Sequence, residues 1–85
     1  MPAKFLITQG SVKKNLKRLP IQIHKKIIKA LDKIKENPII GGKLHGELEN
    51  YYKFRVGDYR IVYEFDAKTS IVTVVKVEHR QGVYK

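Results

Sequence analysis

Residues 52–65, YKFRVGDYRIVYEF, limit the folds open to this chain more than any other segment. Two runs rich in aromatic and β-branched residues flank Gly57-Asp58, and glycine in the first loop position is typical of a type II′ turn. The pattern therefore predicts a hairpin with a two-residue loop. In that register, Arg55 on one strand lies directly opposite Arg60 on the other.

Side chains alternate between the two faces of a strand, so this hairpin has an apolar face and a basic face. The apolar face consists of Tyr52, Phe54, Val56, Tyr59, Ile61, Tyr63 and Phe65. The basic face carries Lys53, Arg55 and Arg60. Like charges directly opposite each other cost about 0.2–1 kcal/mol. Glu64 shares this face but lies four residues beyond Arg60, too far along to neutralise Arg55. An anion held between the cations is one candidate to offset the cost.

The rest of the chain predicts helices before the hairpin and a strand after it. Apolar residues in IQIHKKIIKALDKIKE recur at helical spacing, and Asn37-Pro38 should end that helix. The predicted elements are a strand at 3–8, a helix capped by Thr8 or Ser11 and extending to about Arg18, a helix at 21–36, a loop at 37–50 with a short strand near Leu44, the hairpin, a turn at 66–70 and a strand at 71–78.

This order, β-α-α-β-β-β, predicts an α+β fold in which residues 1–85 form one small domain. The two N-terminal helices should pack on one face of a largely antiparallel sheet, against the apolar side of the hairpin. Its basic side then faces solvent or a ligand. The position of the last strand, central or at the edge, stays open because IVTVV is apolar on both faces.

The charge balance points to an anionic partner. Lys and Arg number 18 against 8 Asp and Glu, a formal net charge of +10, and such a field attracts polyanions. An acidic protein segment or an anionic membrane surface is equally compatible with this charge. The chain has no cysteine, no signal peptide and no apolar run near the roughly 20 residues of a membrane span, so we expect a cytoplasmic protein that does not enter a membrane.

The residues give little support to metal or nucleotide chemistry. The three histidines, His24, His45 and His79, are scattered without metal-ligand spacing, and the glycine-rich phosphate-binding patterns are absent. We therefore expect no cofactor. The residues that remain as candidates for catalysis are Lys53, Arg55, Arg60, His79, Arg80 and Tyr84. If the last strand neighbours 59–65, its end brings His79 and Arg80 toward the basic face, and the tail can place Tyr84 nearby.

Such a set suits cleavage of an RNA phosphodiester without a metal. The 2′-OH must lose a proton, the phosphate gains negative charge, and the 5′ oxygen must gain a proton. Fixed guanidinium groups stabilise the developing charge on phosphorus. A group that titrates near neutrality can move the protons, and a tyrosine can stack on a base.

The run LHGELENYYKFRVGDYRIVYEF, followed by VEHRQGVYK, resembles the RelE/ParE toxin superfamily, and its RelE branch in particular. The resemblance covers nearly the whole chain. It implies a toxin of a toxin–antitoxin system, an mRNA interferase that cuts ribosome-bound mRNA in the A site by 2′-OH attack and is inhibited by a cognate antitoxin. It also implies that Lys53, Arg55, Arg60, Arg80 and Tyr84 contact substrate or act in catalysis, with His79 in the accompanying HR pair.

One position departs from the best-known members of this branch, which have a second lysine where this chain has Arg55. Arginine stays protonated, so it can bind phosphate but is a poor base. Lys53, with a pKa lowered by its cationic neighbours, and His79 remain as alternatives for the base. Two other functions remain open on the same fold: a ParE-like inhibitor of DNA gyrase, and an inactive relative that only binds RNA or an acidic partner.

Overall fold

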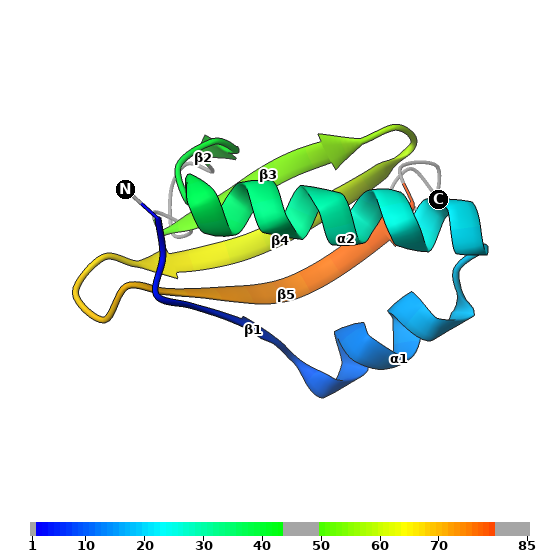
Figure 1. The fold of residues 1–85 in the computed structure, drawn as a ribbon, viewed down its shortest axis with the longest axis horizontal. Coiled ribbons are helices and arrows are strands. Elements are labelled where there is room, and N and C mark those ends of the chain that lie inside the picture. The colour runs from blue at the N-terminus through cyan, green and yellow to red at the C-terminus, as the bar shows by residue number, and fades with distance from the viewer. Residues whose placement is uncertain (1, 44–49, 80–85) are drawn as a thin grey trace.

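The computed structural model describes residues 2–43 and 50–79 (Figure 1). Its elements are β1 (Phe5–Thr8), α1 (Gly10–Arg18), α2 (Ile21–Glu36), β2 (Gly42–Lys43), β3 (Tyr51–Val56), β4 (Tyr59–Asp66) and β5 (Ile71–His79). The strands form one five-stranded sheet in the order β1-β5-β4-β3-β2. The helix α2 lies across one face of this sheet, and α1 lies beside the end of β1. The predicted α+β fold and element order are confirmed, and β2 lies in the 37–50 segment where a short strand near Leu44 was predicted.

The strand β5 is internal, which answers the question of its position. It pairs with β1 in parallel and with β4 antiparallel, so the sheet is mixed. Val72 and Val74 have no exposed surface because elements cover β5 on both edges and on its inner face. The strand extends one residue further than predicted and includes His79.

The β3–β4 hairpin has the predicted register, with Arg55 opposite Arg60. Gly57 adopts a φ of 59°, while Asp58 does not have a positive φ. A positive φ at the first loop position alone is the signature of a type II′ turn. The turn chemistry of Gly57-Asp58 therefore sets the register of the hairpin.

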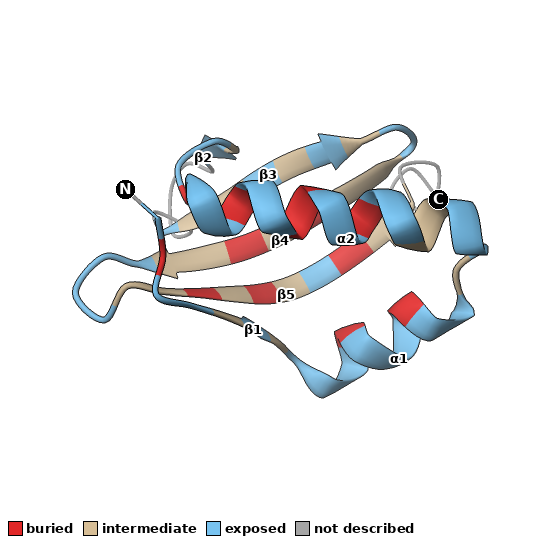
Figure 2. Cartoon of the chain, viewed as in Figure 1, coloured by how far each residue is buried: buried red, intermediate tan, exposed pale blue. Residues whose placement is uncertain are grey.

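The core lies between the two helices and the inner face of the sheet (Figure 2). Its buried members are Ala3, Val12, Leu16, Ile27, Ala30, Leu31, Ile34, Ile61, Tyr63, Val72, Val74 and Val77. The aromatic face of the hairpin packs against this cluster, as predicted. No helix within the described part of the chain is long and apolar enough to cross a membrane.

The helix ends match the prediction in part. The helix α2 ends at Glu36 with Asn37 as its C-cap, as the Asn37-Pro38 pair indicated. The prediction that Thr8 or Ser11 caps α1 is wrong, because Gln9 occupies the N-cap and makes no side-chain capping bond. Thr8 is instead a residue of β1, paired with Val74, so its backbone belongs to the sheet.

A β-bulge in β5 reverses the faces of the strand's last residues. Val62 pairs with Lys76, whereas the next residue, Tyr63, pairs with Val74, so Val75 is the extra residue of β5. Before the bulge Val74 points into the core, and after it Val77 does. Strict alternation from Val74 would have buried Lys76 and exposed Val77. The bulge therefore keeps charged residues out of the core.

The buried side chain of Tyr63 holds the segment after α2 against the sheet. Its hydroxyl donates to the carbonyl of Pro38 at 2.8 Å and accepts from the N–H of Gly41 at 3.0 Å. The Tyr52 ring stacks on it at a centroid distance of 5.4 Å. A Cβ on Gly41 would lie 2.6 Å from the Lys53 carbonyl oxygen, so only glycine fits there. The close packing of Gly41 on the Lys53 backbone places the next residue, Gly42, in β2 opposite Lys53.

We expect Tyr63→Phe to lower the free energy of unfolding by about 1–3 kcal/mol, because it leaves the Pro38 carbonyl and the Gly41 N–H without their buried partner. The thermal midpoint should fall by at least about 4 °C. Tyr52→Phe is the matched control, since the Tyr52 hydroxyl makes no hydrogen bond within the described residues and the ring stacking survives. Equal midpoints for the two variants would contradict this role.

Because of the buried Tyr63 hydroxyl, we expect the folded chain to lose stability at alkaline pH. Burial raises the pKa of Tyr63, because the phenolate is disfavoured away from water, although the hydrogen bond from Gly41 opposes the shift. The folded chain thus keeps a proton that the unfolded chain loses above about pH 10. The stability difference between the parent and Tyr63→Phe should therefore shrink as pH rises above about 10, as measured by urea unfolding. A constant difference from pH 8 to 11 would refute the assignment.

Candidate functional site

Three basic side chains of the hairpin lie on the face of the sheet that the helices leave open. Arg55 and Arg60 are directly opposite each other, and Lys53 is on the same side of β3, two residues before Arg55. Lys53 and Arg55 are exposed, whereas Arg60 is half-buried. The structure thus brings together the three hairpin residues of the predicted site.

An acidic residue of the neighbouring strand offsets the charge of Arg60. Glu78 on β5 pairs with Arg60 in the sheet register. Its Oε1 accepts a hydrogen bond from Arg60 Nε at 3.1 Å and another from Arg60 Nη2. Its Oε2 lies 3.9 Å from Lys76 Nζ. The Glu78 carboxylate therefore supplies part of the negative charge that offsets the repulsion between Arg55 and Arg60.

Glu78, and not the Glu64 weighed from the sequence, neutralises the basic face. The signal was present in IVTVVKVEH, where polar residues lie at Thr73, Lys76 and Glu78. The gap of three followed by a gap of two breaks strict alternation, which indicates a bulge near Val75. Read that way, Glu78 falls on the open face beside Arg60.

The same bulge places His79 on the other face. His79 pairs with Tyr59, and their rings meet edge to face at a centroid distance of 4.9 Å. Tyr59 packs against the core cluster on the helix side of the sheet. The expectation that the end of this strand carries His79 to the basic face is therefore wrong, because the bulge exchanges the faces of residues 76–79.

The aliphatic part of Lys53 runs beside a glycine of the edge strand. Gly42 pairs with Lys53, and a Cβ on Gly42 would lie 3.9 Å from both Cγ and Cε of that lysine. This is ordinary van der Waals contact, so the lysine stem lies along the backbone of β2. The hydrogen bonds of Tyr63 to Pro38 and Gly41, which hold β2 in place, thereby also help to orient Lys53.

The remaining candidates cannot be placed. Arg80 and Tyr84 lie outside the described residues. Within residues 2–43 and 50–79, no three His, Cys, Asp or Glu side chains gather as metal ligands would.

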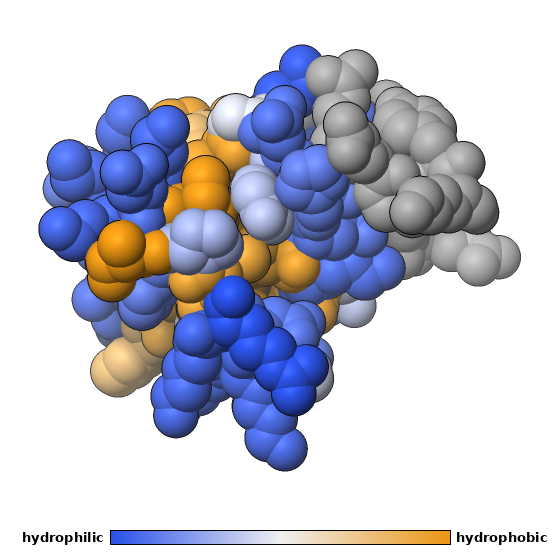
Figure 3. Space-filling model, turned by 90° about the vertical axis from the view of Figure 1, so that its right-hand side faces the viewer, coloured by the Kyte–Doolittle hydropathy of each residue, from blue (hydrophilic) through white to orange (hydrophobic). Residues whose placement is uncertain are grey.

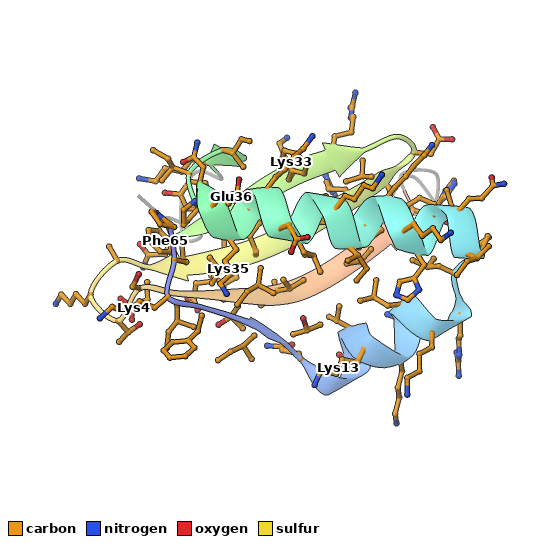
Figure 4. The ribbon with its side chains drawn as sticks, viewed as in Figure 1. Lys4, Lys13, Lys33, Lys35, Glu36 and Phe65 are labelled. Atoms are coloured by element: carbon orange, nitrogen blue, oxygen red, sulfur yellow. The ribbon has the colours of Figure 1, made fainter. Side chains whose placement is uncertain are left out.

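Positive charge also covers the helices. Figure 4 shows side chains that project outward from both helices, with Lys13 labelled on α1 and Lys33 and Lys35 on α2. A shallow groove of about 280 Å³ lies between α2 and β3, and its basic lining consists of Lys26, Lys29, Lys33 and Arg55. At the end where α1 joins α2, hydrophilic surface surrounds a central apolar band (Figure 3). The chain thus presents basic groups on two sides of the sheet.

A mixed sheet with two N-terminal helices packed against it is the fold of the RelE-like toxins. The chain belongs to the family described as ParE toxin of type II toxin-antitoxin system, parDE, which it matches over residues 6–84. This family lies within the RelE/ParE toxin superfamily, so the chain is a toxin of the type II toxin–antitoxin class.

Individual relatives agree with this assignment. The chain is 33% identical over 79 residues to RelE1 of Methanocaldococcus jannaschii, with 87% of each protein covered. It is 27% identical over 77 residues to toxin RelG of Mycobacterium tuberculosis, with 88% of each covered. The fold is similar to two solved structures of a mutant E. coli toxin RelE. For the free toxin the TM-score is 0.82 at 25% identity, covering 99% of this chain and 90% of the other. For its complex with a peptide of antitoxin RelB the TM-score is 0.77 at 29% identity, covering 96% of this chain and 90% of the other.

We expect Arg55→Gln to stabilise the fold by about 0.2–1 kcal/mol at low salt, because it removes a like charge directly opposite Arg60. The gain should diminish in 1 M salt, where the screening length falls to about 3 Å. Lys53→Gln is the matched control, since Lys53 lies opposite Val62 rather than a cation. Thermal unfolding at both salt concentrations measures the effect. Equal gains from both variants would show that overall charge, and not the arginine pair, is responsible.

Proposed function

We propose that this toxin is a metal-independent endoribonuclease that cleaves ribosome-bound mRNA in the A site. The observation that carries the proposal is the gathering of Lys53, Arg55 and Arg60 on the open face of the sheet, in a chain of the RelE/ParE superfamily. A small region of concentrated positive charge fits a phosphodiester better than a protein helix or a small apolar ligand.

The arginines bind the scissile phosphate in this mechanism. Guanidinium groups donate paired hydrogen bonds to phosphate oxygens and remain charged at all relevant pH values. Arg60 is held by Glu78 at one edge of its guanidinium group, which leaves other N–H donors for the phosphate. As O2′ attacks phosphorus, negative charge grows on the equatorial oxygens, and cations fixed beside them lower the barrier.

The rest of the predicted set enters the proposal as follows. Lys53 donates a proton to the 5′ oxygen or assists in phosphate binding. Arg80 and Tyr84 are proposed to complete the site through charge and base stacking, as the family resemblance implies. His79 lies beside Tyr59 on the helix side, so in this arrangement it supports the end of β5 and does not contact the phosphate.

The partners follow from charge and from the relatives. We propose that a cognate antitoxin binds this toxin and blocks the basic face, since the related E. coli RelE mutant has been solved with a peptide of antitoxin RelB. The lysines of α1 and α2 give the ribosome a second region to contact while the sheet face meets the message. The net charge of +10 speeds association with both.

A second candidate is inhibition of DNA gyrase, favoured by the match to the ParE toxin family. Such a toxin binds its target and needs no phosphodiester chemistry. The two candidates differ in what stops first when the chain is produced without an antitoxin.

Arg60→Ala should abolish cleavage of ribosome-bound mRNA while the fold persists. The Arg60–Glu78 pair is partly exposed, with side-chain exposures of 35% and 25%, and such pairs contribute only about 0–1 kcal/mol. Purified parent and variant are incubated with programmed ribosomes, and the message ends are mapped. Lys68→Ala, which removes an exposed cation from the β4–β5 turn, controls for charge. Cleavage by Arg60→Ala at the parent rate would remove Arg60 from the site.

Production of the parent chain alone should halt growth by stopping translation, with new 5′ ends inside coding regions. Incorporation of labelled amino acid and of labelled thymidine is followed over time together with end mapping. Arrest of replication with intact messages would instead select the gyrase candidate. Arrest of translation with intact messages would indicate a toxin that blocks ribosomes without cutting.

A further inference from the structure

Within the described residues, the two oxygens of the Glu78 carboxylate have different surroundings. Both hydrogen bonds from Arg60 reach Oε1. Oε2 accepts no hydrogen bond within the described residues, and its nearest recorded cation is Lys76 Nζ at 3.9 Å. The Glu78 side chain is 25% exposed, on the open face. A molecule bound to Arg60 from that face would therefore meet a fixed carboxylate oxygen with free lone pairs.

The proposed reaction lacks a suitable base among the residues considered so far. Arg55 and Arg60 stay protonated. His79 lies on the other face of the sheet. In the proposed mechanism Lys53 donates a proton to the 5′ oxygen or assists in phosphate binding, so another group must take the proton of the 2′-OH. Glu78 is a carboxylic acid residue on this face that contacts the phosphate-binding Arg60 through one oxygen and directs a second oxygen elsewhere.

Resting on the proposed function, we propose that Glu78 is the general base of the cleavage reaction. Oε2 takes the proton of the 2′-OH as O2′ forms a bond to phosphorus. The bond between phosphorus and O5′ breaks, and O5′ takes a proton from the ammonium group of Lys53. The products are a 2′,3′-cyclic phosphate and a 5′-hydroxyl end, with the proton on Glu78 returned to Lys53 through solvent.

Arg60 couples binding to this proton transfer. It holds Glu78 through Nε and Nη2, so a phosphate on its remaining donors is placed within a few ångströms of the same carboxylate. Lys76 and Arg60 are the charged groups beside Glu78 on β5 and β4, and Arg55 follows on β3. The positive charge of these side chains favours an anionic phosphate beside the same carboxylate. Geometry and charge thus act together on one oxygen.

A positioning role for Glu78 makes a different prediction from a base role. A glutamine at this position keeps an oxygen that can accept from Arg60 but cannot take a proton from a hydroxyl group. We therefore expect Glu78→Gln to bind programmed ribosomes like the parent, unfold at a similar temperature, and cleave at least about 100-fold more slowly in a single turnover. Glu64→Gln is the matched control, because it removes the same charge from the same face.

Chemical rescue separates the roles further. Glu78→Ala leaves space for a small carboxylate, so formate should restore cleavage while chloride at equal ionic strength does not. The inference is overturned if Glu78→Gln lowers the cleavage rate by less than about tenfold, or if formate does not restore cleavage by Glu78→Ala. In either case, cleavage by the parent chain still supports the proposed function. A parent chain that does not cleave programmed ribosomes overturns both.

Discussion

The register of the β3–β4 hairpin decides both what the core contains and what the open face presents. A slip of one residue would exchange Tyr63 and Ile61, which are fully buried, for Arg60 and Val62. The type II′ turn at Gly57-Asp58 and the burial of the aromatic face favour the same register, so the two constraints reinforce each other. Arg55 and Arg60 face outward because they alternate along the strands with the residues that this register buries. Their mutual repulsion is tolerated because the burial of the opposite face outweighs it.

The bulge at Val75 is the second determinant of the site. It lets β5 bury Val74 and Val77 although they are three residues apart, an odd spacing that strict alternation would divide between opposite faces. As a consequence Glu78 joins Arg60 and Lys76 on the open face, and His79 joins Tyr59 on the helix side. One extra residue therefore determines which acid and which imidazole lie near the basic cluster. Bulges often lie beside functional sites, where they redirect side chains in this way.

Most of the fold could be predicted because its signals are local. The hairpin turn, the apolar stripe of α2 and the Asn37-Pro38 ending each act within a few residues of the chain. What the sequence did not reveal depends on contacts between distant segments. The parallel pairing of β1 with β5 makes β5 an internal strand. The same pairing includes Thr8 in the sheet, so Gln9 becomes the N-cap of α1. Within the site, the basic residues of the hairpin followed from alternation, whereas Glu78 and His79 were misjudged because their faces depend on the bulge.

The proposed mechanism requires that the message contacts the open face of the sheet and not the lysine-rich helices. A photo-crosslinking side chain at Val62, which lies between Lys53 and Lys76 on the open face, would report that contact in ribosome complexes. The same group at Ile28, exposed on α2, serves as the reference position. The message should carry a 2′-deoxy nucleotide at the A site so that it stays intact. If the open face binds the message, Val62 forms crosslinks to mRNA and Ile28 forms none. Crosslinks to mRNA from Ile28 with none from Val62 would contradict this mode of binding.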